Sequence, residues 1–339
     1  MSKYKKSGVD IDKAARSVEN IGRIVKDTYS GNVLSQIGSF GAMYSADFGS
    51  MKNPVLISSA DGVGTKLVIA RKMNSFKHTG EDIVNHSVND ILATGAKPLY
   101  FLDYIGCGSV EEDTVNDIIR SMADACKSND MSLIGGELAE MSVIYDYTHY
   151  DIVGFITGIA DKDSIITGDT VSEGDIVIGL PSSGFHTNGY TLIREIIDSN
   201  NIDLRAVPPF GNRKLYELLL EPHRSYYKPV YPLIEKHLLK GIAHITGGGF
   251  YDNIRRILPA DVNVIIESQS WDIPPLFDYI VTLGSIDTQE AYRVFNMGIG
   301  MVLIINPDNI SEVKDHLQKH SEYFIIGSVS KGEGIVKID

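Results

Sequence analysis

The sequence predicts a mixed α/β protein built from two domains. At 339 residues the chain is long enough for two domains that each have a full hydrophobic core. Short apolar runs that favour strands, such as Pro54–Ser59 and Asp175–Leu180, alternate with stretches of helical periodicity such as Glu81–Thr94. A charged, turn-rich passage at Asp161–Glu173 has little apolar periodicity. We therefore place a domain boundary within that passage, with one domain at 1–167 and the other at 168–339.

Composition excludes several classes of protein. The chain is 43% hydrophobic and 22% charged, as an ordinary globular protein is, and its formal net charge of −13 argues against a nucleic-acid or anionic-membrane partner. Its apolar runs are too short to span a bilayer, its first residues carry no signal-like stretch, and its two cysteines suit a reducing compartment. We expect a cytoplasmic protein. An acidic chain that binds phosphate needs magnesium, held by carboxylates, to offset the repulsion.

The stretch Asp61-Gly62-Val63-Gly64-Thr65-Lys66 directly follows the apolar run Pro54–Ser59, which is typical of a buried strand. Glycines in a loop let the backbone approach phosphate oxygens, the lysine adds a positive charge, and the aspartate can hold a hard cation. An ordinary turn is the alternative interpretation.

Further carboxylates are expected close to the ends of predicted elements in the first half. Gly135-Gly136-Glu137 follows the apolar run Met131–Ile134, and Asp103 lies at the end of the strand predicted at Leu99–Tyr104. Asp90 stands near the end of the helix Glu81–Thr94. The rest of that helix's polar side, which includes Asp82, Asn85 and His86, is typical of a solvated face.

Two glycine-containing loops dominate the second half. Pro181–Gly189 follows a predicted strand and contains Ser183 and His186, so it suits either an anion site or an ordinary capped helix start. Downstream, His244 precedes three consecutive glycines, Gly247–Gly249. Three glycines before a helix cost backbone entropy, which favours a close approach by a ligand or another backbone.

Taken together, these stretches resemble the phosphoribosylformylglycinamidine cyclo-ligase family, also called aminoimidazole ribonucleotide synthetase, of purine biosynthesis. The matching motifs occur in the family's order over nearly the whole chain. They are Gly8–Asp12, Asp61–Lys66, Val88–Asp90, Phe101–Tyr104, Gly135–Glu137, Ala139–Met141, Ser182–Gly184, His186, Asn188–Tyr190, His244–Phe250 and Phe295–Met301.

The resemblance implies a fold, a reaction and a set of partners. The fold is a two-domain aminoimidazole-ribonucleotide-synthetase-like architecture, with an N-terminal domain that forms a β-barrel at a homodimer interface and a C-terminal α/β domain. The reaction is an ATP-dependent ring closure of a small ribonucleotide. In it the γ-phosphoryl group of ATP passes to the substrate amide oxygen, and an amidine nitrogen then attacks the same carbon.

The resemblance also assigns roles to residues by motif. Magnesium would be held by Asp61, Asp90 and Glu137, and Asp90, His186 and His244 would take part in catalysis. The segment Lys6–Asp12 would close over ATP. The nucleotide would contact Gly64, Thr65, Lys66, Asp103, Gly135 and Gly136, and the substrate would contact Ser183, His186, Gly247, Gly248 and Gly249.

The motif at Gly135–Glu137 departs from the family pattern on its C-terminal side. Leu138 stands where the family usually has threonine, and Ser142 where it usually has proline. Two alternatives follow: a related ATP-dependent small-molecule kinase, such as thiamine phosphate kinase, and a non-catalytic nucleotide-binding sensor. The retained carboxylates favour an enzyme over a sensor.

Overall fold

The computed structural model describes residues 19–339, so the segment Lys6–Asp12 lies outside the described residues. The chain divides into two compact units. Unit 1 comprises Met1–Ile91 and Pro98–Asp161, and unit 2 comprises Leu92–Lys97 and Lys162–Asp339. Within the described part of the chain, no helix combines the length and the apolar character that crossing a membrane requires.

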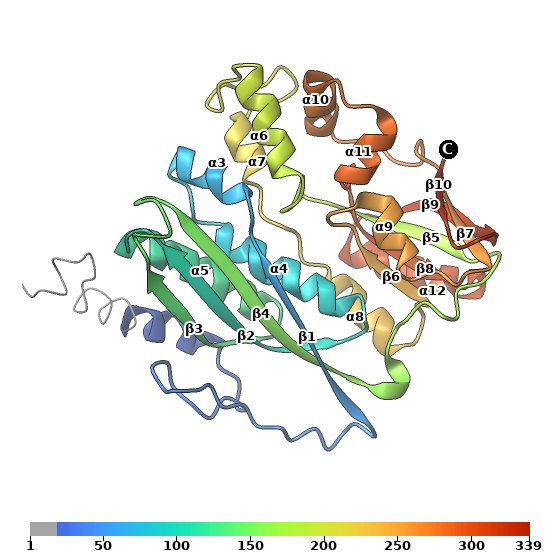
Figure 1. Cartoon of the computed structure of the whole chain (residues 1–339). Helices are drawn as coiled ribbons and strands as arrows, with labels where there is room; N and C mark the ends of the chain where they lie inside the picture. Colours follow the sequence, from blue (N-terminus) through green and yellow to red (C-terminus); the bar gives the residue numbers. More distant parts are fainter. Residues whose placement is uncertain (1–18) are drawn as a thin grey trace, which may run out of the picture. The chain divides into compact units, whose positions relative to one another are not determined.

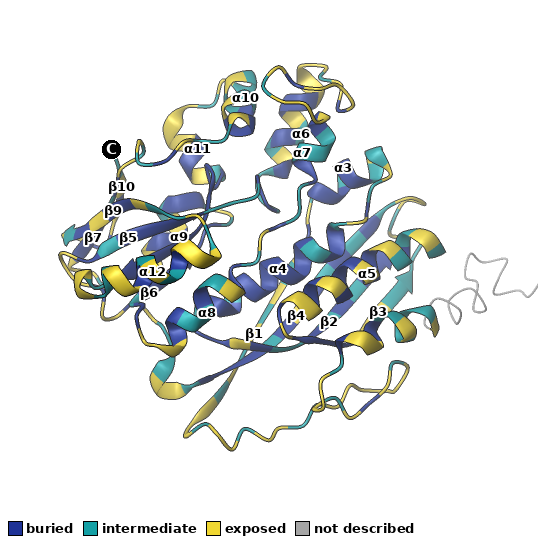
Figure 2. Ribbon diagram, turned by 180° about the vertical axis from the view of Figure 1, so that it is seen from behind, coloured by how far each residue is buried: buried dark blue, intermediate teal, exposed yellow. Residues whose placement is uncertain are grey.

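Unit 1 is a four-stranded sheet with helices on one face (Figures 1 and 2). The strand order is β1-β4-β2-β3, with β1 antiparallel to β4 and β2 parallel to β3. Residues 19–25 are helical and run into the 3₁₀ turn η1. The elements are η1 (Lys26–Thr28), β1 (Pro54–Gly62), α3 (Lys66–Met73), α4 (Thr79–Leu92), β2 (Lys97–Cys107), α5 (Glu112–Ser128), β3 (Ser132–Glu140) and β4 (Tyr150–Asp161).

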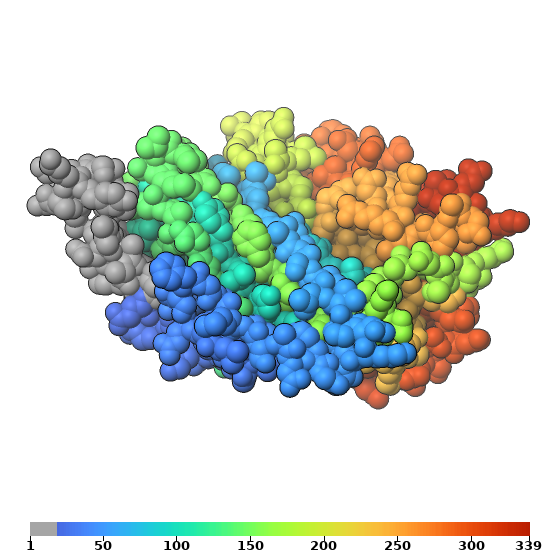
Figure 3. All heavy atoms as spheres, turned by 60° about the horizontal axis from the view of Figure 1, so that its bottom comes forward, coloured from blue at the N-terminus to red at the C-terminus, as the bar shows by residue number. Residues whose placement is uncertain are grey.

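The two faces of this sheet differ in how far they are covered. Helices α4 and α5 cover one face, where the apolar stripe of α5, including Val115, Ile119 and Met122, is buried (Figure 2). The other face keeps Leu56 57% exposed and Phe155 44% exposed. Residues 36–48 line a cavity together with these two side chains, and Figure 3 shows this blue segment at the surface.

Unit 2 contains a six-stranded mixed sheet in the order β10-β7-β9-β5-β8-β6 (Figure 1). Strand β8 is buried along its whole length. The elements are η2 (Lys162–Ser164), β5 (Ile176–Pro181), α6 (Tyr190–Ser199), α7 (Leu215–Leu219), α8 (Tyr227–Glu235), β6 (Gly241–His244), α9 (Gly249–Arg255), β7 (Val262–Ile266), α10 (Pro275–Gly284), α11 (Thr288–Val294), β8 (Ile299–Ile305), η3 (Pro307–Asn309), α12 (Ile310–His320), β9 (Phe324–Lys331) and β10 (Val336–Ile338).

The directions of strands β5 and β6 in unit 2 explain why the loops that follow them lie near each other. Strands β5 and β6 are both antiparallel to the strand between them, β8. They therefore run in the same direction, and the loops that follow them lie at the same end of the sheet, where the carboxyl ends of both strands are. Those loops carry Ser183 and His186 after β5, and Gly247–Gly249 after β6.

The mixed α/β class is confirmed, whereas three local expectations are wrong. The run Pro54–Ser59 is not a buried strand, because β1 is the sheet edge and its residues alternate between exposed and half-buried. Gly135–Glu137 lie within β3 and not in a loop after it, because that strand extends beyond its apolar run, whereas Asp103 lies in a strand as expected, although β2 continues to Cys107. The polar side of α4 is not solvated: Asp82, Asn85, His86 and Asn89 are buried.

Candidate nucleotide and substrate sites

A pair of carboxylates in unit 1 surrounds one histidine. Asp61, near the end of β1, and Asp90, in the last turn of α4, lie 3.6 and 3.5 Å from the Nε2 atom of His86. Burial, together with the neighbouring Asp90 carboxyl, raises the pKa of Asp61 to about 6. Burial alone would lower the pKa of His86, but the Asp90, Asp61 and Asp82 carboxylates outweigh it and raise that pKa.

This pair has the chemistry of a hard-cation site. Two carboxylates that share a small space repel each other when both are ionised, and a bound divalent cation relieves that repulsion. Their oxygen atoms are the ligands that Mg²⁺ prefers. Asp61 and Asp90 therefore fit the magnesium ion that the sequence motifs imply.

Glu137 is not part of the same group within one chain. It lies on β3, and Asp61 lies on β1, at the opposite edge of the four-stranded sheet. Three strand spacings put these two strands about 14 Å apart. At that separation Glu137 would not share one ion with Asp61 and Asp90 of the same chain, and its assignment to magnesium stays a prediction.

Lys66 is placed differently from the expected contact with phosphate. It is the first residue of α3, its side chain is fully buried, and its Nζ atom lies 2.7 Å from Oδ1 of Asp82. A buried ammonium paired with a carboxylate holds α3 to α4. The residues before it, Gly64 and Thr65, form the turn between β1 and α3, and Gly64 has a φ of 71° that suits glycine.

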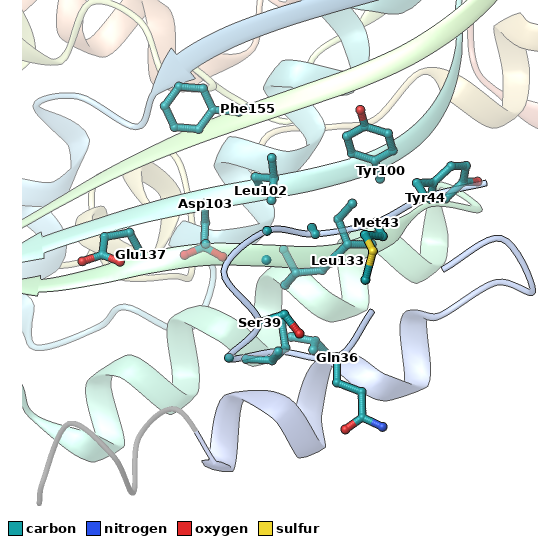
Figure 4. A pocket seen from close by; sticks show the side chains of 18 of the residues that line it. Gln36, Ser39, Met43, Tyr44, Tyr100, Leu102, Asp103, Leu133, Glu137 and Phe155 are labelled. Atoms are coloured by element: carbon teal, nitrogen blue, oxygen red, sulfur yellow. The ribbon is translucent and has the colours of Figure 1, made fainter. Parts of the chain in front are cut away.

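Unit 1 contains a cavity of about 1100 Å³ on the uncovered side of its sheet. Residues 36–48 form one wall, and strands β2 and β3 form the other with Asp103, Gly135, Gly136 and Glu137 (Figure 4). Asp103 pairs in register with Gly136 on the neighbouring strand. A Cβ atom at Gly136 would lie 2.5 Å from Oδ2 of Asp103, so the missing side chain makes room for this carboxyl.

Asp103 is a buried acid at the wall of this cavity. Only 8% of the residue is exposed, and burial raises its pKa to about 7. It is therefore partly protonated near neutral pH. In either form its oxygen atoms can accept a hydrogen bond from a ligand amino group, and in the protonated form it can also donate one.

The raised pKa of Asp103 predicts how pH affects stability. An unfolded aspartate has a pKa near 3.9, so between about pH 4 and pH 7 the folded chain holds a proton that the unfolded chain has lost. Stability falls as pH rises through this window. We expect Asp103→Asn to be more stable than the natural chain by on the order of 2 kcal/mol at about pH 8, and the difference to vanish near pH 4.

Thermal unfolding midpoints measured across this pH range test that expectation. Asp124→Asn removes the same charge at an exposed position of α5 and serves as the matched control, with a small difference at every pH. A pH-independent difference for Asp103→Asn would contradict the burial argument.

In unit 2, the loop after β5 is held by hydrogen bonds at several points. The hydroxyl group of Ser183 donates to the carbonyl of Pro222 at 2.5 Å, and the Ser183 backbone N–H donates to Nε2 of His186 at 3.2 Å. Asn296 donates to the carbonyl of Gly184 at 2.9 Å. His186 is buried and adopts a left-handed backbone with φ of 59°, which a non-glycine residue keeps only when its surroundings hold it there.

The glycine loop after β6 is also fixed from within. The side chain of Asn253 donates to the carbonyls of Thr246, Gly247 and Gly249. Gly248 and Gly249 have positive φ, and a Cβ atom at Gly249 would lie 2.0 Å from the carbonyl oxygen of Tyr292. The unusual glycine run therefore has a structural cause at Gly249, where the backbone of another segment approaches.

Gly247 differs from its two neighbours. A Cβ atom there would meet nothing closer than the side chain of Asn188, at 3.5 Å. Asn188 lies in the loop after β5, so the two loops that the sequence singles out adjoin each other at one edge of the sheet. Gly247 is the glycine whose openness suits a ligand.

Two groups of residues that the structure brings to these sites were not predicted from the sequence. Residues 36–48 form most of one cavity wall, and in the sequence they stand out only by the glycines Gly38 and Gly41. His223 lies in a polar connecting segment, yet it is fully buried with its Nε2 atom 3.0 Å from Nε2 of His244. Nothing in its local sequence distinguishes it from a surface histidine.

Comparisons with known proteins cover both units. Residues 46–160 match the N-terminal domain of AIR synthase related proteins, and residues 172–339 match the C-terminal domain of the same group. A protein of Caldicellulosiruptor saccharolyticus named phosphoribosylformylglycinamidine cyclo-ligase is 45% identical over 337 residues, which are 98% of each chain.

Solved structures share the fold at low sequence identity. Thiamine-monophosphate kinase from Stenotrophomonas maltophilia has a TM-score of 0.67 and 15% identity, and the match covers 94% of both chains. Hydrogenase maturation protein HypE, solved in complex with ATP, has a TM-score of 0.69 and 14% identity over 98% of this chain and 92% of that one. Proteins with other names therefore share this fold at low sequence identity, whereas the 45% identity over nearly the full length is to a cyclo-ligase. The chain belongs to the phosphoribosylformylglycinamidine cyclo-ligase family.

Proposed function

We propose that this chain catalyses the ATP-dependent cyclisation of formylglycinamidine ribonucleotide to aminoimidazole ribonucleotide, ADP and phosphate, in purine biosynthesis. The observation that carries this proposal is the 45% identity over 98% of both chains to a relative with that name. The enzyme is a ligase that closes a ring by forming a C–N bond.

The difficulty in this reaction is the amide oxygen, which is a poor leaving group. Transfer of the γ-phosphoryl group makes it a good one, after which the amidine nitrogen attacks the same carbon and phosphate departs. Positioning and charge stabilisation are the protein's main tasks in such a transfer. Asp61 and Asp90 would hold Mg²⁺, which would neutralise charge on the phosphate oxygens, and their positions close to Nε2 of His86 support this assignment.

We assign the nucleotide to unit 1. The cavity of about 1100 Å³ has room for it, and the buried Asp103 offers a hydrogen-bonding group in an otherwise largely apolar wall. Gly135 and Gly136 leave the backbone of β3 accessible to a ligand. Gly64 and Thr65, which are not among the residues that line the cavity, follow Asp61 in the chain and would contact the phosphates from the turn after β1. Lys66 contributes by holding α3 in position rather than by direct contact.

We assign the ribonucleotide substrate to the adjoining loops of unit 2. Ser183 and His186 come from the loop after β5, and Gly247–Gly249 follow β6. The open position at Gly247 suits a phosphate or ribose oxygen that hydrogen-bonds to backbone N–H groups. His186 and His244 are the nearby side chains able to accept or release a proton during ring closure.

The uncovered sheet face in unit 1 supports a homodimer. Leu56 and Phe155, which line part of the cavity, are also exposed on this face, and exposed apolar side chains on one face are typical of an interface. Joining two such sheets would form the expected barrel. Light scattering measures the mass directly, and a mass of one chain at micromolar concentration would contradict this part of the proposal. The net charge of −13 and the small-molecule substrate suit the cytoplasm.

One assay tests the reaction. The purified chain is mixed with Mg²⁺, ATP and formylglycinamidine ribonucleotide, and ADP and the aminoimidazole product are followed together. Equal amounts of the two products are expected. ADP without the imidazole would indicate a kinase acting on another acceptor, and ATP binding without either product would indicate a nucleotide sensor.

A further inference from the structure

Three buried histidines of unit 2 meet although they come from segments far apart in the sequence. His186 lies in the loop after β5, His223 lies between α7 and α8, and His244 is the last residue of β6. They are 1%, 0% and 5% exposed. One ring nitrogen from each lies within 4.8 Å of the other two. Burying three imidazoles in one place is costly unless they bind something or one another.

The His223 and His244 pair already has nearly the spacing of two ligands on one ion. Their Nε2 atoms are 3.0 Å apart, and their ring centroids are 5.0 Å apart. Two nitrogen ligands on a tetrahedral Zn²⁺ ion, with bonds of about 2.0–2.1 Å, lie about 3.3 Å from each other. A few tenths of an ångström of opening would convert the direct contact into a pair of metal ligands.

Neighbouring groups set which ring nitrogens carry lone pairs. Oγ1 of Thr187 lies 3.4 Å from Nδ1 of His223, and in the tautomer with a hydrogen on that Nδ1 the Nε2 atom of His223 accepts from Nε2–H of His244. Metal binding to both rings then requires the His244 hydrogen to move to its other ring nitrogen or to be lost. A backbone N–H can only donate, so Nε2 of His186, which receives the Ser183 N–H at 3.2 Å, is also unprotonated. A metal ion at this nitrogen would replace a long hydrogen bond.

The surrounding backbone makes room for the cluster. A Cβ atom at Gly300 in β8 would lie 2.5 Å from Cε1 of His186 and 2.1 Å from the hydroxyl oxygen of Tyr226. His186 has a left-handed backbone and its ring stacks on that of His223 with centroids 3.9 Å apart, so these two rings must slide apart by about 1 Å for both to bind one tetrahedral ion. The three rings are thus held together by the strand β8 on one side and by the loop after β5 on the other.

We propose that His186, His223 and His244 form a binding site for one divalent transition-metal ion of the Zn²⁺ type. Neutral imidazoles suit Zn²⁺, Co²⁺, Ni²⁺ and Cu²⁺, whereas Mg²⁺ takes oxygen ligands. The cluster contains no carboxylate, so it differs in chemistry from the Asp61 and Asp90 pair. Three protein ligands leave a fourth position open for water or another small ligand, and while the ion is bound the coordinating nitrogens of His186 and His244 do not accept a proton.

Cobalt titration of the full chain tests the site without any activity measurement. Tetrahedral Co²⁺ with nitrogen ligands absorbs visible light far more strongly than Co²⁺ surrounded by water. We expect one intensely absorbing Co²⁺ ion per chain after chelator treatment, and Zn²⁺ should displace it. His223→Gln, which keeps a hydrogen-bonding side chain near Thr187, should weaken Co²⁺ binding by at least about tenfold.

The chain offers a matched control at the surface. His316 and His320 on α12 have ring centroids 4.5 Å apart and form the obvious competing site. His320→Gln should leave the cobalt spectrum and affinity unchanged. Absence of the strong absorption in the natural chain, or its loss in His320→Gln but not in His223→Gln, would overturn the proposal.

A second measurement needs no variant, which matters if His223→Gln fails to fold. X-ray absorption at the zinc edge of the Zn²⁺-loaded natural chain should show three imidazole nitrogens at about 2.0 Å. A spectrum with oxygen ligands and no more than one imidazole would place the ion elsewhere and reject the site.

Discussion

Replacing Lys66 with methionine is expected to lower the free energy of unfolding by about 3–5 kcal/mol. The Lys66 and Asp82 side chains are 0% and 1% exposed, and their charged atoms are 2.7 Å apart. Methionine keeps most of the volume of lysine but removes its charge. The Asp82 carboxylate would then stay buried without its ammonium partner, which is the costly way to break a buried pair.

A surface pair of the same length provides the control. Lys236 and Glu312 are also 2.7 Å apart, but each side chain is 54% exposed, so Lys236→Met should cost less than about 1 kcal/mol. Denaturant unfolding of both variants measures the contrast. The double variant Lys66→Met, Asp82→Leu should recover much of the loss, because it leaves no unpaired charge in the interior. Equal small costs for Lys66→Met and Lys236→Met would show that burial is not decisive here.

The partner of Lys66 could not be predicted from the residues next to it in the sequence. A lysine after a glycine-containing turn is expected to reach a phosphate, because the pattern describes only the residues next to it. Its partner Asp82 lies 16 residues later, on another helix, and looked like part of a solvated face. Only the packing of α3 against α4 brings the two charges together, and no spacing in the sequence encodes that contact.

The existence of a helix or strand could be predicted from the sequence better than its first and last residues. The apolar residues Val115, Ile119 and Met122 recur at helical spacing in the sequence, and α5 forms around them over Glu112–Ser128. Strands β2 and β3 extend several residues past the apolar runs that predicted them, because backbone pairing continues where side chains turn polar. Gly135–Glu137 are therefore part of a strand and not of a loop, and Gly136 pairs with Asp103 on the neighbouring strand.

Long-range placement of the carboxylates depended on strand order. The family resemblance assigned Asp61, Asp90 and Glu137 to magnesium one by one, without placing them relative to one another. The order β1-β4-β2-β3 puts Asp61 and Glu137 on opposite edges of the sheet. The order of strands follows from how the whole unit packs, so motifs could suggest the residue types of the site but not the distances between them.

Replacing Asp90 with asparagine is expected to lower kcat for the cyclisation by at least about 10²-fold. The side chain is 26% exposed and shares its surroundings with Asp61 and His86. Asparagine keeps the shape and one oxygen but loses the negative charge that a divalent cation requires. The concentration of Mg²⁺ needed for half-maximal rate should rise, and steady-state assays over a range of Mg²⁺ measure both effects.

Two opposed electrostatic effects should leave stability nearly unchanged, and this separates a site role from a structural one. Removing the Asp90 charge relieves its repulsion of Asp61 but also removes its attraction for His86, so the thermal midpoint should stay close to that of the natural chain. Asp117→Asn, at an exposed position of α5, removes the same charge and should retain full activity. A stable Asp90→Asn variant with near-normal turnover would remove Asp90 from the metal site, because a dispensable carboxylate cannot be the one that positions the cation for phosphoryl transfer.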